Sequence, residues 1–507
     1  MSPETVMDCI SLTATTASTM SPETAMDWIS STGATACSMS PEPATAAGAM
    51  SPEPAPAAGT MSPEPSPAHQ QSADAEEPFS SHYGDVPSEE IQSKTVSGRV
   101  WSKVRDLNEA AAGRSVLIRG RVHVIRRVSN KMAFVVLRQG MSTVQCVLVA
   151  NPDDGVSTQM IRFATLLSKE SIVDIKGVVS LPKEQLKSTT QQVEIQVRMI
   201  YCISRALTTL PMNVEDAARS ESEFENTVQA GEKHARVGQD TRLNYRSIDL
   251  RTPANQAIFH IQYQVENKFR EFLLSKDFVG IHTPKLIGGS SEGGAAVFKL
   301  MYNGKPACLA QSPQLYKQMA ILGGFERVFE VGSVFRAEKS NTHRHLCEFI
   351  GLDAEMEINE HYFEVCDIID GLFVSVFKHL TENCKNELET INKQYPFEPL
   401  KYLDKTLKLS YEEGIHMLKE AGTEIEPMGD LNTEAEKKLG RLVREKRAVE
   451  CGIDVNTISS YIESFSYGAS PHGGFGVGLE RVVMLFCALN NIRKTSLFPR
   501  DTQRLFP

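Results

Sequence analysis

The segment FRAEKSNTHRHLCEFIGLDAEME, residues 335 to 357, has two strand-like stretches around a polar, basic tip. Residues two apart leave a β-strand on the same face. The side chains that would share a face in this way are Arg336 and Glu338 on the first stretch and Phe349, Asp353 and Glu355 on the return stretch. Gly351 lies between Phe349 and Asp353, where the missing side chain lets a flat group approach the sheet. An arginine, a ring and several acids on one face suit a ligand that is both flat and charged.

Two other segments carry candidate residues. Gln314 and Lys317 are three residues apart in the helix-like stretch SPQLYKQMAIL, so they lie on one face of that helix. Near the C-terminus, the stretch GVGLERV brings Arg481 close behind Gly476 and Gly478, which allow a close approach of the backbone. Taken alone, these patterns are also typical of a stray lysine and of a solvated arginine at the start of a helix.

The length and the charge limit what kind of protein this is. A chain of 507 residues is too long for one ordinary core, so we expect two or more domains. The net charge is −10, but no Lys or Arg precedes Lys94, and this acidic start argues against a secretory or mitochondrial presequence. No apolar run is long enough to span a bilayer, which predicts a soluble, cytoplasmic protein without a membrane contact. The ten cysteines form no CxxC pair and predict reduced, mostly buried thiols.

Residues 1 to 95 are predicted to be a disordered tail. The stretch MSPE recurs five times there in a background of Pro, Ala, Ser and Thr. Such a composition buries too little apolar surface to offset the entropy of the chain. A tail that binds a partner or is phosphorylated remains an alternative, although the repeat itself carries little chemistry.

Residues 96 to 206 contain five β-rich runs, with one helix-like segment after the third run. This order predicts a closed Greek-key barrel of the OB type, a fold that often binds single-stranded nucleic acid. The segment has 17 Lys and Arg against 8 Asp and Glu, which favours a polyanionic partner. Arg126, Phe134 and Gln145 could supply a cation, a stacking ring and an amide for base edges. Alternatively, Phe134 is a core residue, because its neighbours are apolar.

The remaining chain reads as a hinge followed by a larger domain. Residues 207 to 250 are polar and acidic, as expected for a hinge. A long amphipathic helix follows, then an extended glycine-rich stretch, and nearly every segment from Tyr362 to Glu463 reads as helical. The predicted fold class is therefore α+β, with an OB barrel ahead of an antiparallel sheet flanked by helices.

In this order, the segments resemble the class II aminoacyl-tRNA synthetases, and among them the cytoplasmic aspartyl enzymes of subclass IIb. The resemblance covers residues 96 to 507 and leaves the repeat tail outside. Motif 1 of the family corresponds to residues 257 to 285 with Pro284, motif 2 to residues 327 to 356, and motif 3 to residues 473 to 490. The implied domains are an anticodon-binding barrel at 96 to 206, a hinge at 207 to 250, and a catalytic domain at 251 to 507.

The resemblance implies a role for each matching residue. Arg336 and Arg481 would be the catalytic residues, with Arg336 on the α-phosphate and Arg481 on the γ-phosphate. The ATP site would comprise Arg336, Glu338, Arg344, His345, Leu346, Phe349, Gly478, Leu479, Glu480 and Arg481. The aspartate site would comprise Glu292, Gln314, Lys317, Arg336 and Asp353, and the anticodon readers would be Arg126, Phe134 and Gln145.

The implied reaction is the ATP-dependent formation of aspartyl adenylate, followed by transfer of aspartate to the 3′ end of tRNA(Asp). ATP and Mg²⁺ would be required, and motif 1 would form a homodimer. Membership of a multi-synthetase complex is left open. An asparagine ligase is a further alternative, although the combination of SNTHRHL and GLDAEM favours aspartate.

The sequence departs from the family pattern in two places. The lysine-rich helix that often precedes the barrel is replaced by the acidic repeat. In addition, Lys446 runs directly into Arg447, where the family has several dozen further residues. By resemblance, that segment holds core strands, a Mg²⁺-binding glutamate and the arginine that fixes the substrate carboxylate, so no metal ligand is identified here. A catalytically impaired, synthetase-like tRNA-binding or regulatory protein is therefore the alternative to an active ligase.

Overall fold

A computed structural model describes residues 79–229, 235–289, 291, 296–404, 419 and 470–506. These residues fall into two compact units, with the boundary between Thr208 and Thr209. Most of the MSPE-repeat tail, Glu292 and the junction of Lys446 with Arg447 lie outside the described residues. No helix among the described residues is long and apolar enough to cross a membrane.

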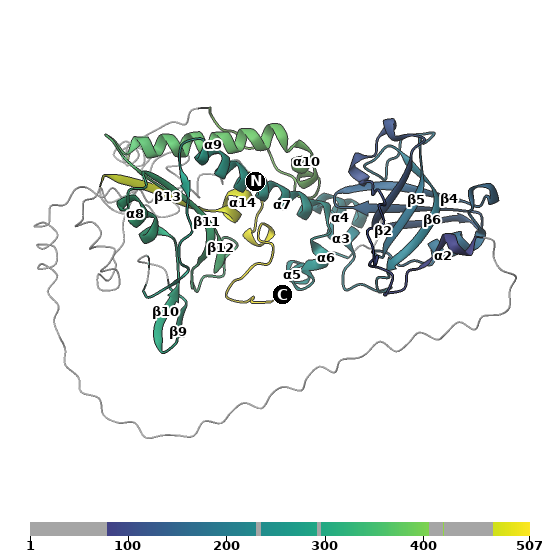
Figure 1. The fold of residues 1–507 in the computed structure, drawn as a ribbon, viewed down its shortest axis with the longest axis horizontal. Coiled ribbons are helices and arrows are strands. Elements are labelled where there is room, and N and C mark those ends of the chain that lie inside the picture. The colour runs from purple at the N-terminus through teal and green to yellow at the C-terminus, as the bar shows by residue number, and fades with distance from the viewer. Residues whose placement is uncertain are drawn as a thin grey trace, which may run out of the picture. The chain divides into compact units, whose positions relative to one another are not determined.

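The first unit is a closed five-stranded barrel (Figure 1). Its strands are β2 (Ser115–Ser129), β3 (Met132–Gln139), β4 (Ser142–Val149), β5 (Ile172–Ser180) and β6 (Glu194–Ser204). They pair in the order β2, β3, β4, β6, β5 and back to β2, and α2 (Thr158–Thr165) lies between β4 and β5. The predicted OB-type barrel and its inserted helix are therefore confirmed. Three short 3-10 helices, Val104–Asp106, Glu109–Ala111 and Pro152–Asp154, complete this unit.

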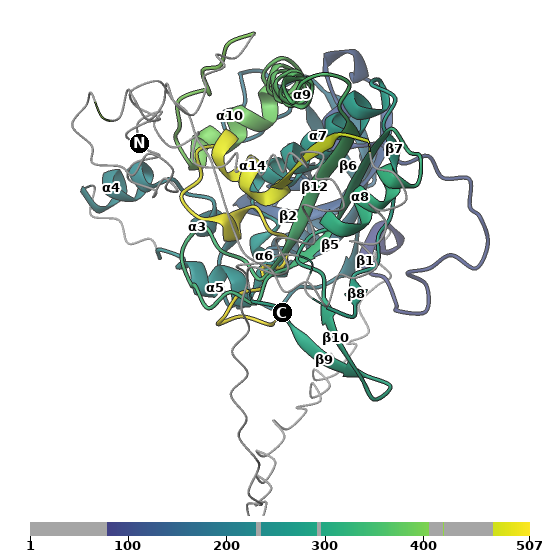
Figure 2. The same cartoon turned by 90° about the vertical axis from the view of Figure 1, so that its left-hand side faces the viewer.

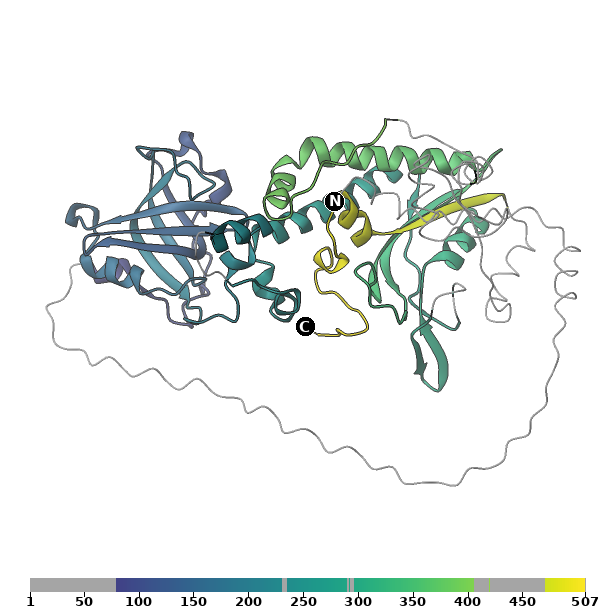
Figure 3. The ribbon, with the colours of Figure 1, turned by 180° about the vertical axis from the view of Figure 1, so that it is seen from behind.

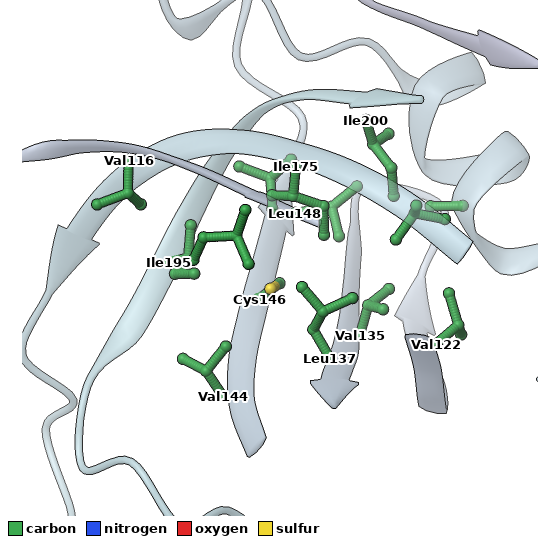
Figure 4. Close-up of a cluster of buried hydrophobic side chains, with 14 of the residues drawn as sticks. Val116, Val122, Val135, Leu137, Val144, Cys146, Leu148, Ile175, Ile195 and Ile200 are labelled. Atoms are coloured by element: carbon green, nitrogen blue, oxygen red, sulfur yellow. The ribbon is translucent and has the colours of Figure 1, made fainter. Parts of the chain in front are cut away.

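The barrel closes around alternate apolar side chains of its strands (Figure 4). Period-two alternation sends every second residue inward, and these positions hold branched residues that fill the interior. The fully buried members include Ile118, Val135, Leu137, Cys146, Ile175 and Ile195. Burial raises the pKa of the Cys146 thiol, as expected for an inert buried cysteine.

Residues 80–85 form regular structure within the segment that the sequence placed in the tail. A 3-10 helix at Ser80–His82 leads into β1 (Tyr83–Asp85), which pairs in parallel with β6. The Tyr83 ring packs 5.5 Å from the Phe163 ring, and Asp85 forms an ion pair with Arg205 at 2.7 Å. The sequence carried no sign of this strand, because a three-residue strand held by backbone bonds gives no hydrophobic period.

The second unit is built on a four-stranded sheet with the order β13, β12, β11, β7 among the described residues. These strands are β7 (Val279–Gly280), β11 (Arg327–Phe335), β12 (Glu348–Glu357) and β13 (His472–Gly478). β12 is antiparallel to both of its neighbours, and β7 is parallel to β11. A smaller sheet contains β8 (Leu286–Ile287), β9 (Lys299–Tyr302) and β10 (Lys305–Leu309).

Helices cover both faces of the main sheet. On one face, Phe269 of α7 (Pro253–Leu274) packs edge-on against Phe329 of β11 and Phe475 of β13. On the other face, α8 (Gln314–Leu322) packs against β11 and β12 (Figure 2). β13 runs directly into α14 (Leu479–Phe486), as Figure 3 shows. α9 (Phe363–Asn383) and α10 (Lys385–Gln394) pack against α7 and agree with the first part of the predicted helical region, whose remainder after residue 404 lies almost entirely outside the described residues.

The predicted hinge is more regular than expected. It contains α3 (Val214–Ala217), α4 (Glu221–Gln229), α5 (Gln239–Asn244) and α6 (Arg246–Asp249). Arg246 and Arg242 both pair with the buried carboxylate of Asp249, at 2.5 and 2.8 Å. The polar composition of this segment thus reflects a buried ion-pair network as well as exposed surface. A last 3-10 helix, Ile492–Lys494, precedes the C-terminal residues.

Candidate active site

The floor of the candidate site is a row of three glycines on three neighbouring strands. Gly351 of β12 is directly opposite Gly332 of β11 on one side and Gly478 of β13 on the other. Directly opposite residues in antiparallel strands project to the same face. The row leaves room for neighbouring side chains to lie over the backbone, since a Cβ at Gly351 would lie 2.7 Å from Asp353 Oδ2 and a Cβ at Gly332 would lie 2.9 Å from Glu330 Oε1.

Acidic side chains lie beside this row on the same face. The next row contains Glu330, Asp353 and Gly476, and the row after that contains Glu355 opposite Gly474. A Cβ at Gly476 would lie 2.5 Å from Asp353 Oδ1, and a Cβ at Gly474 would lie 2.2 Å from Glu355 Oε2. The glycines of β13 thus make room for the two carboxylates. Glu330 already has a partner, since Lys285 Nζ lies 2.8 Å from its Oε1.

Lys317 is the cation that these carboxylates surround. Its Nζ lies 3.4 Å from Asp353 Oδ1 and 3.3 Å from Glu355 Oε2, and the side chain is 2% exposed. Burial alone would lower the pKa of Lys317, but the attraction of Asp353 and Glu355 outweighs it and raises that pKa. Lys317 therefore stays protonated in a dry environment. Its neighbour Gln318 donates a hydrogen bond of 3.3 Å to Glu355 Oε1.

The structure thus brings together Lys317 and Asp353, which the sequence singled out, and adds two residues that were not assigned to the site. Glu355 was visible in the sequence as part of the period-two pattern. Gln318 had no signal, because its role depends on the packing of α8 over β12. Gln314, the first residue of α8, lies one turn before Lys317 and is half-buried.

The family resemblance implies aspartate as the substrate, and we predict that Gly476→Ala weakens its binding at least tenfold while the chain still folds. The added methyl would meet the end of the Asp353 side chain, which must move away from Lys317. Gly473→Ala is the matched control, because its Cβ would meet only flexible apolar side chains, the nearest atom being Ile358 Cδ1 at 3.2 Å. The measurement is the KM for aspartate in pyrophosphate exchange. An equal rise in KM in both variants would contradict the prediction.

Arg336 and Phe349 lie together close to the glycine row. The Arg336 guanidinium carbon is 5.9 Å from the centre of the Phe349 ring, and both side chains are half-buried. The Arg336 backbone N–H donates to Cys347 O at 2.9 Å, which extends the pairing of β11 and β12 beyond Phe335. A Cβ at Gly478 would lie 3.4 Å from the Phe349 ring, an ordinary contact distance. A planar cation and an aromatic ring on one face can hold a phosphate and a flat base, respectively.

The loop after Arg336 carries the other predicted nucleotide contacts. Glu338 Oε2 lies 3.4 Å from His345 Nε2. Arg481, at the start of α14, donates from Nη2 to the carbonyl oxygen of Arg344 at 3.3 Å. The two motifs, which are more than 130 residues apart in sequence, therefore meet. The side chains of Leu346 and Leu479 are buried.

Glu480 faces the backbone of β12. Its carboxylate accepts the Ile350 N–H at 3.1 Å, just beyond the last residue pair of β12 and β13. The carboxylate thereby supplies the acceptor that a continuing strand would have supplied. Burial raises the pKa of Glu480 to about 7, against the lowering effect of the backbone hydrogen bonds.

We predict that Glu480→Gln makes the stability of the protein less dependent on pH. Between pH 4.5 and about 7 the unfolded chain loses the Glu480 proton while the folded chain keeps it, so the free energy of unfolding falls as the pH rises. Glutamine removes this penalty, which amounts to up to about 3 kcal/mol at pH 8. Urea unfolding of both proteins at pH 5, 6, 7 and 8 checks this. Parallel curves for both proteins would contradict it.

No group of three or more His, Cys, Asp or Glu that could hold a metal ion occurs among the described residues. The acids closest to the floor, Asp353 and Glu355, are engaged by Lys317. The described residues therefore do not supply a three-ligand cage, and Mg²⁺ commonly binds through substrate phosphates and only one or two carboxylates.

The barrel has a candidate site of its own. Arg126 of β2 and Phe134 of β3 are directly opposite, with the guanidinium carbon 4.8 Å from the ring centre. Gln145 of β4 is opposite Val136, so it shares the face of Phe134. The interior is filled by Ala133, Val135 and Leu137, so Phe134 is not a core residue. Gln145 donates to Glu194 Oε1 at 2.7 Å, a partner that the sequence did not reveal because it lies on β6.

Comparison with known proteins identifies the family. Residues 238–452 and 442–502 match the family described as tRNA synthetases class II (D, K and N), and residues 116–203 match the OB-fold nucleic acid binding domain. The chain belongs to the class II aminoacyl-tRNA synthetases. Both compact units of this synthetase are thus accounted for, and the predicted fold class is confirmed.

Among the relatives and solved structures that this synthetase matches are aspartyl and asparaginyl enzymes. The synthetase is 56% identical over 503 residues to aspartate–tRNA ligase 2, cytoplasmic, of Arabidopsis thaliana, a match that covers 86% of this chain and 90% of that relative. It is 38% identical to the solved aspartyl-tRNA synthetase of Entamoeba histolytica, with a TM-score of 0.74 over 84% of this chain and 96% of that one. The asparaginyl-tRNA synthetase of Pyrococcus horikoshii is 25% identical, with a TM-score of 0.64 over 81% of this chain and 100% of that one.

The comparison also bears on the missing segment. The two pieces of the family match meet at residues 442–452, around the junction of Lys446 with Arg447. The Arabidopsis alignment spans 503 residues, whereas 86% of the 507 residues of this synthetase is about 436, so about 67 positions of that relative have no counterpart here. Both observations agree with the interruption inferred from the sequence.

Proposed function

We propose that this synthetase is an aspartate–tRNA ligase of cytoplasmic translation. It would activate L-aspartate with ATP and transfer the aspartyl group to tRNA(Asp). The identity of 56% with a cytoplasmic aspartate–tRNA ligase, against 25% with an asparaginyl enzyme, supports aspartate as the substrate and the cytoplasm as the location.

The observation that carries this proposal is the buried Lys317, whose Nζ lies 3.4 Å from Asp353 Oδ1 and 3.3 Å from Glu355 Oε2. A buried ammonium group discriminates by charge, because it can pair with the side-chain carboxylate of aspartate but not with the neutral amide of asparagine. Asp353 remains next to it to accept the substrate ammonium. Gln314 and Glu292 are proposed to complete the aspartate site, with Glu292 lying outside the described residues.

The nucleotide is proposed to lie across the same floor. Phe349 would stack on adenine, Glu338 would accept from its amino group, and Arg336 would hold the α-phosphate together with the substrate carboxylate. Arg344, His345 and Arg481 would bind the distal phosphates, with Gly478 leaving room for the nucleotide. An oxygen of the α-carboxylate of aspartate then attacks the α-phosphorus of ATP, and pyrophosphate leaves. The arginines would neutralise part of the developing charge and hold the reactants in line, as such a transfer requires.

ATP would enter as its magnesium complex, so Mg²⁺ is proposed as part of the substrate. Because the described residues lack a three-ligand cluster, no step of the reaction is assigned to a protein-bound metal. In the second step, the 3′-terminal hydroxyl of tRNA takes the aspartyl group and AMP leaves. A homodimer through α7 and Pro284 is proposed from the family resemblance.

Pyrophosphate exchange tests the proposal directly. The purified chain is incubated with ATP and labelled pyrophosphate, and aspartate, asparagine or no amino acid is added. Exchange that depends on aspartate supports the ligase, whereas exchange that depends on asparagine contradicts the proposed substrate. Binding of tRNA without any exchange would contradict the proposal and would indicate the alternative, a tRNA-binding protein without activity.

The barrel gives a separate prediction. Phe134→Ala is expected to weaken tRNA binding about tenfold to a hundredfold, because stacking of one base contributes about 1–3 kcal/mol. The rate of pyrophosphate exchange without tRNA should not change, since Phe134 belongs to the other compact unit. Filter binding with tRNA(Asp) measures the affinity. Phe163→Ala is a control at a ring that packs on Tyr83, and a similar loss of affinity there would count against stacking at Phe134.

A further inference from the structure

The loop between β11 and β12, residues 336–347, is held along its backbone by the C-terminal part of the chain. Three consecutive carbonyl oxygens of this loop each accept a hydrogen bond from there. The donors are Arg493 Nη1 to Thr342 O at 3.0 Å, the Ile492 N–H to His343 O at 2.9 Å, and Arg481 Nη2 to Arg344 O at 3.3 Å. The loop that carries Arg344 and His345 is therefore fixed from outside its own hairpin.

Arg493 is the centre of this contact. Its Nη2 donates to Asn341 Oδ1 at 2.8 Å, so its guanidinium holds both a side chain and a carbonyl of the loop. Its Nε donates to Asp501 Oδ2 at 2.6 Å, and Arg493 and Asp501 are both buried. Asp501 is oriented in turn, because its Oδ1 accepts the Gln503 N–H at 2.8 Å. A planar guanidinium with three fixed acceptors has one orientation, which sets the position of the loop.

We propose that Arg493, oriented by Asp501, is a positioning residue that holds the loop 336–347 in the conformation that binds ATP. Arg493 does not touch the floor of the site; it acts through Arg344 and His345 on the loop. The nucleotide part of this inference rests on the proposed function. The part of the inference that concerns the position of the loop needs only the hydrogen bonds of Arg493 and does not depend on the proposed function.

Three variants and one control test this inference in the full chain. Arg493→Gln removes the charge and the fork of donors, and Arg493→Lys keeps the charge but can reach fewer acceptors. Asn341→Ala removes an exposed acceptor on the loop and leaves the Arg493 and Asp501 pair intact. Arg246→Gln is the matched control, because Arg246 is buried, pairs with Asp249 and donates to Ser496 O and Leu497 O but to no loop residue.

The first measurement is hydrogen exchange of the peptide 338–347, with peptide 350–357 of β12 as the reference. Arg493→Gln should speed hydrogen exchange in the loop at least tenfold without changing exchange in the reference peptide. Asn341→Ala and Arg493→Lys should speed exchange in the loop by smaller factors. Arg246→Gln should leave exchange in the loop unchanged. Loop exchange that is unchanged in Arg493→Gln, or equally increased in Arg246→Gln, overturns the inference. If Arg493→Gln does not fold, Asn341→Ala becomes the test. Unchanged hydrogen exchange in the loop of Asn341→Ala then overturns the inference.

The second measurement is the dissociation constant of ATP, by calorimetry, and the KM for aspartate. Arg493→Gln should weaken ATP binding about tenfold to a hundredfold, with a change in the KM for aspartate of less than about threefold, and Arg493→Lys should recover part of the loss. Equal losses for ATP and aspartate overturn the positioning role. An unmodified chain that binds no ATP overturns the proposed function and the nucleotide part of this inference, while loop exchange still tests how the loop is held.

Discussion

Replacement of Lys317 by methionine is expected to lower aspartate-dependent pyrophosphate exchange by at least about 10³. Lys317 neutralises Asp353 and Glu355 in a buried position, and removing one partner of a buried ion pair costs about 3–5 kcal/mol. At about 1.4 kcal/mol per factor of ten, this cost alone corresponds to about 10² to 4 × 10³ in rate or affinity. The substrate would also lose the ammonium group that we propose pairs with its side-chain carboxylate.

A second set of variants should separate the effect of Lys317 on stability from its effect on activity. Lys317→Met combined with Asp353→Asn and Glu355→Gln should recover most of the lost free energy of unfolding, because no buried charge is left without a partner. It should not recover exchange. Lys401→Met, at a side chain that is 75% exposed, is the control and should retain full exchange. Recovery of exchange in the triple variant would show that the ammonium group is not part of the aspartate site.

The pH dependence of this ion pair has a defined sign. Because the pKa of Lys317 is raised above 10.5, its contribution to stability is fully present below pH 10.5. It is lost only as the pH rises through the higher, folded-state pKa. Between pH 6 and 9 the difference in the free energy of unfolding between the wild type and Lys317→Met should therefore not depend on the titration of this lysine.

The second large effect is expected from adding residues. Insertion of the corresponding segment of the Arabidopsis relative between Lys446 and Arg447 should raise aspartate-dependent exchange by about 10² to 10³. By resemblance, that segment carries the arginine that fixes the substrate carboxylate and a glutamate for Mg²⁺. β13 is the last strand of the sheet among the described residues, and we expect the added strands to pair next to it.

A flexible linker of glycine and serine, with the same length and at the same position, is the control for this insertion. It restores the spacing but supplies neither charged residue nor strand, so it should give no gain. Exchange is measured at a saturating concentration of ATP, with aspartate varied. Equal rates for the original chain and the chain with the relative's segment would show that the missing residues are not needed for activation.

The alternation in residues 335 to 357 was sufficient to predict the acidic face of the floor. Phe349, Asp353 and Glu355 share a face, as the pairing of β12 with β11 confirms. The row of Gly332, Gly351 and Gly478 was not predicted, because it depends on register between strands that are far apart in sequence. Arg493 and Asp501 had no local signal either, since the role of Arg493 depends on a loop about 150 residues away.

In the barrel, the local sequence pattern did not determine the position of Phe134. The run AFVVL is apolar throughout, so the sequence left open whether Phe134 is a core residue. The position of Phe134 opposite Arg126 is set by the pairing of β2 with β3. The family resemblance supplied the candidate roles, while the contacts of Glu480 with Ile350 and of Gln318 with Glu355 required the folded chain.

The glycines of β13 have a consequence for how this strand is aligned during folding. Because glycine occurs at 474, 476 and 478, sliding β13 by two residues along β12 would again present glycine to the carboxylates. The alignment must therefore be specified from the opposite side, where Phe475 packs edge-on against Phe269. A smaller side chain at position 475 would let competing alignments coexist, and the geometry around Asp353 would be lost without any change to a residue that contacts it.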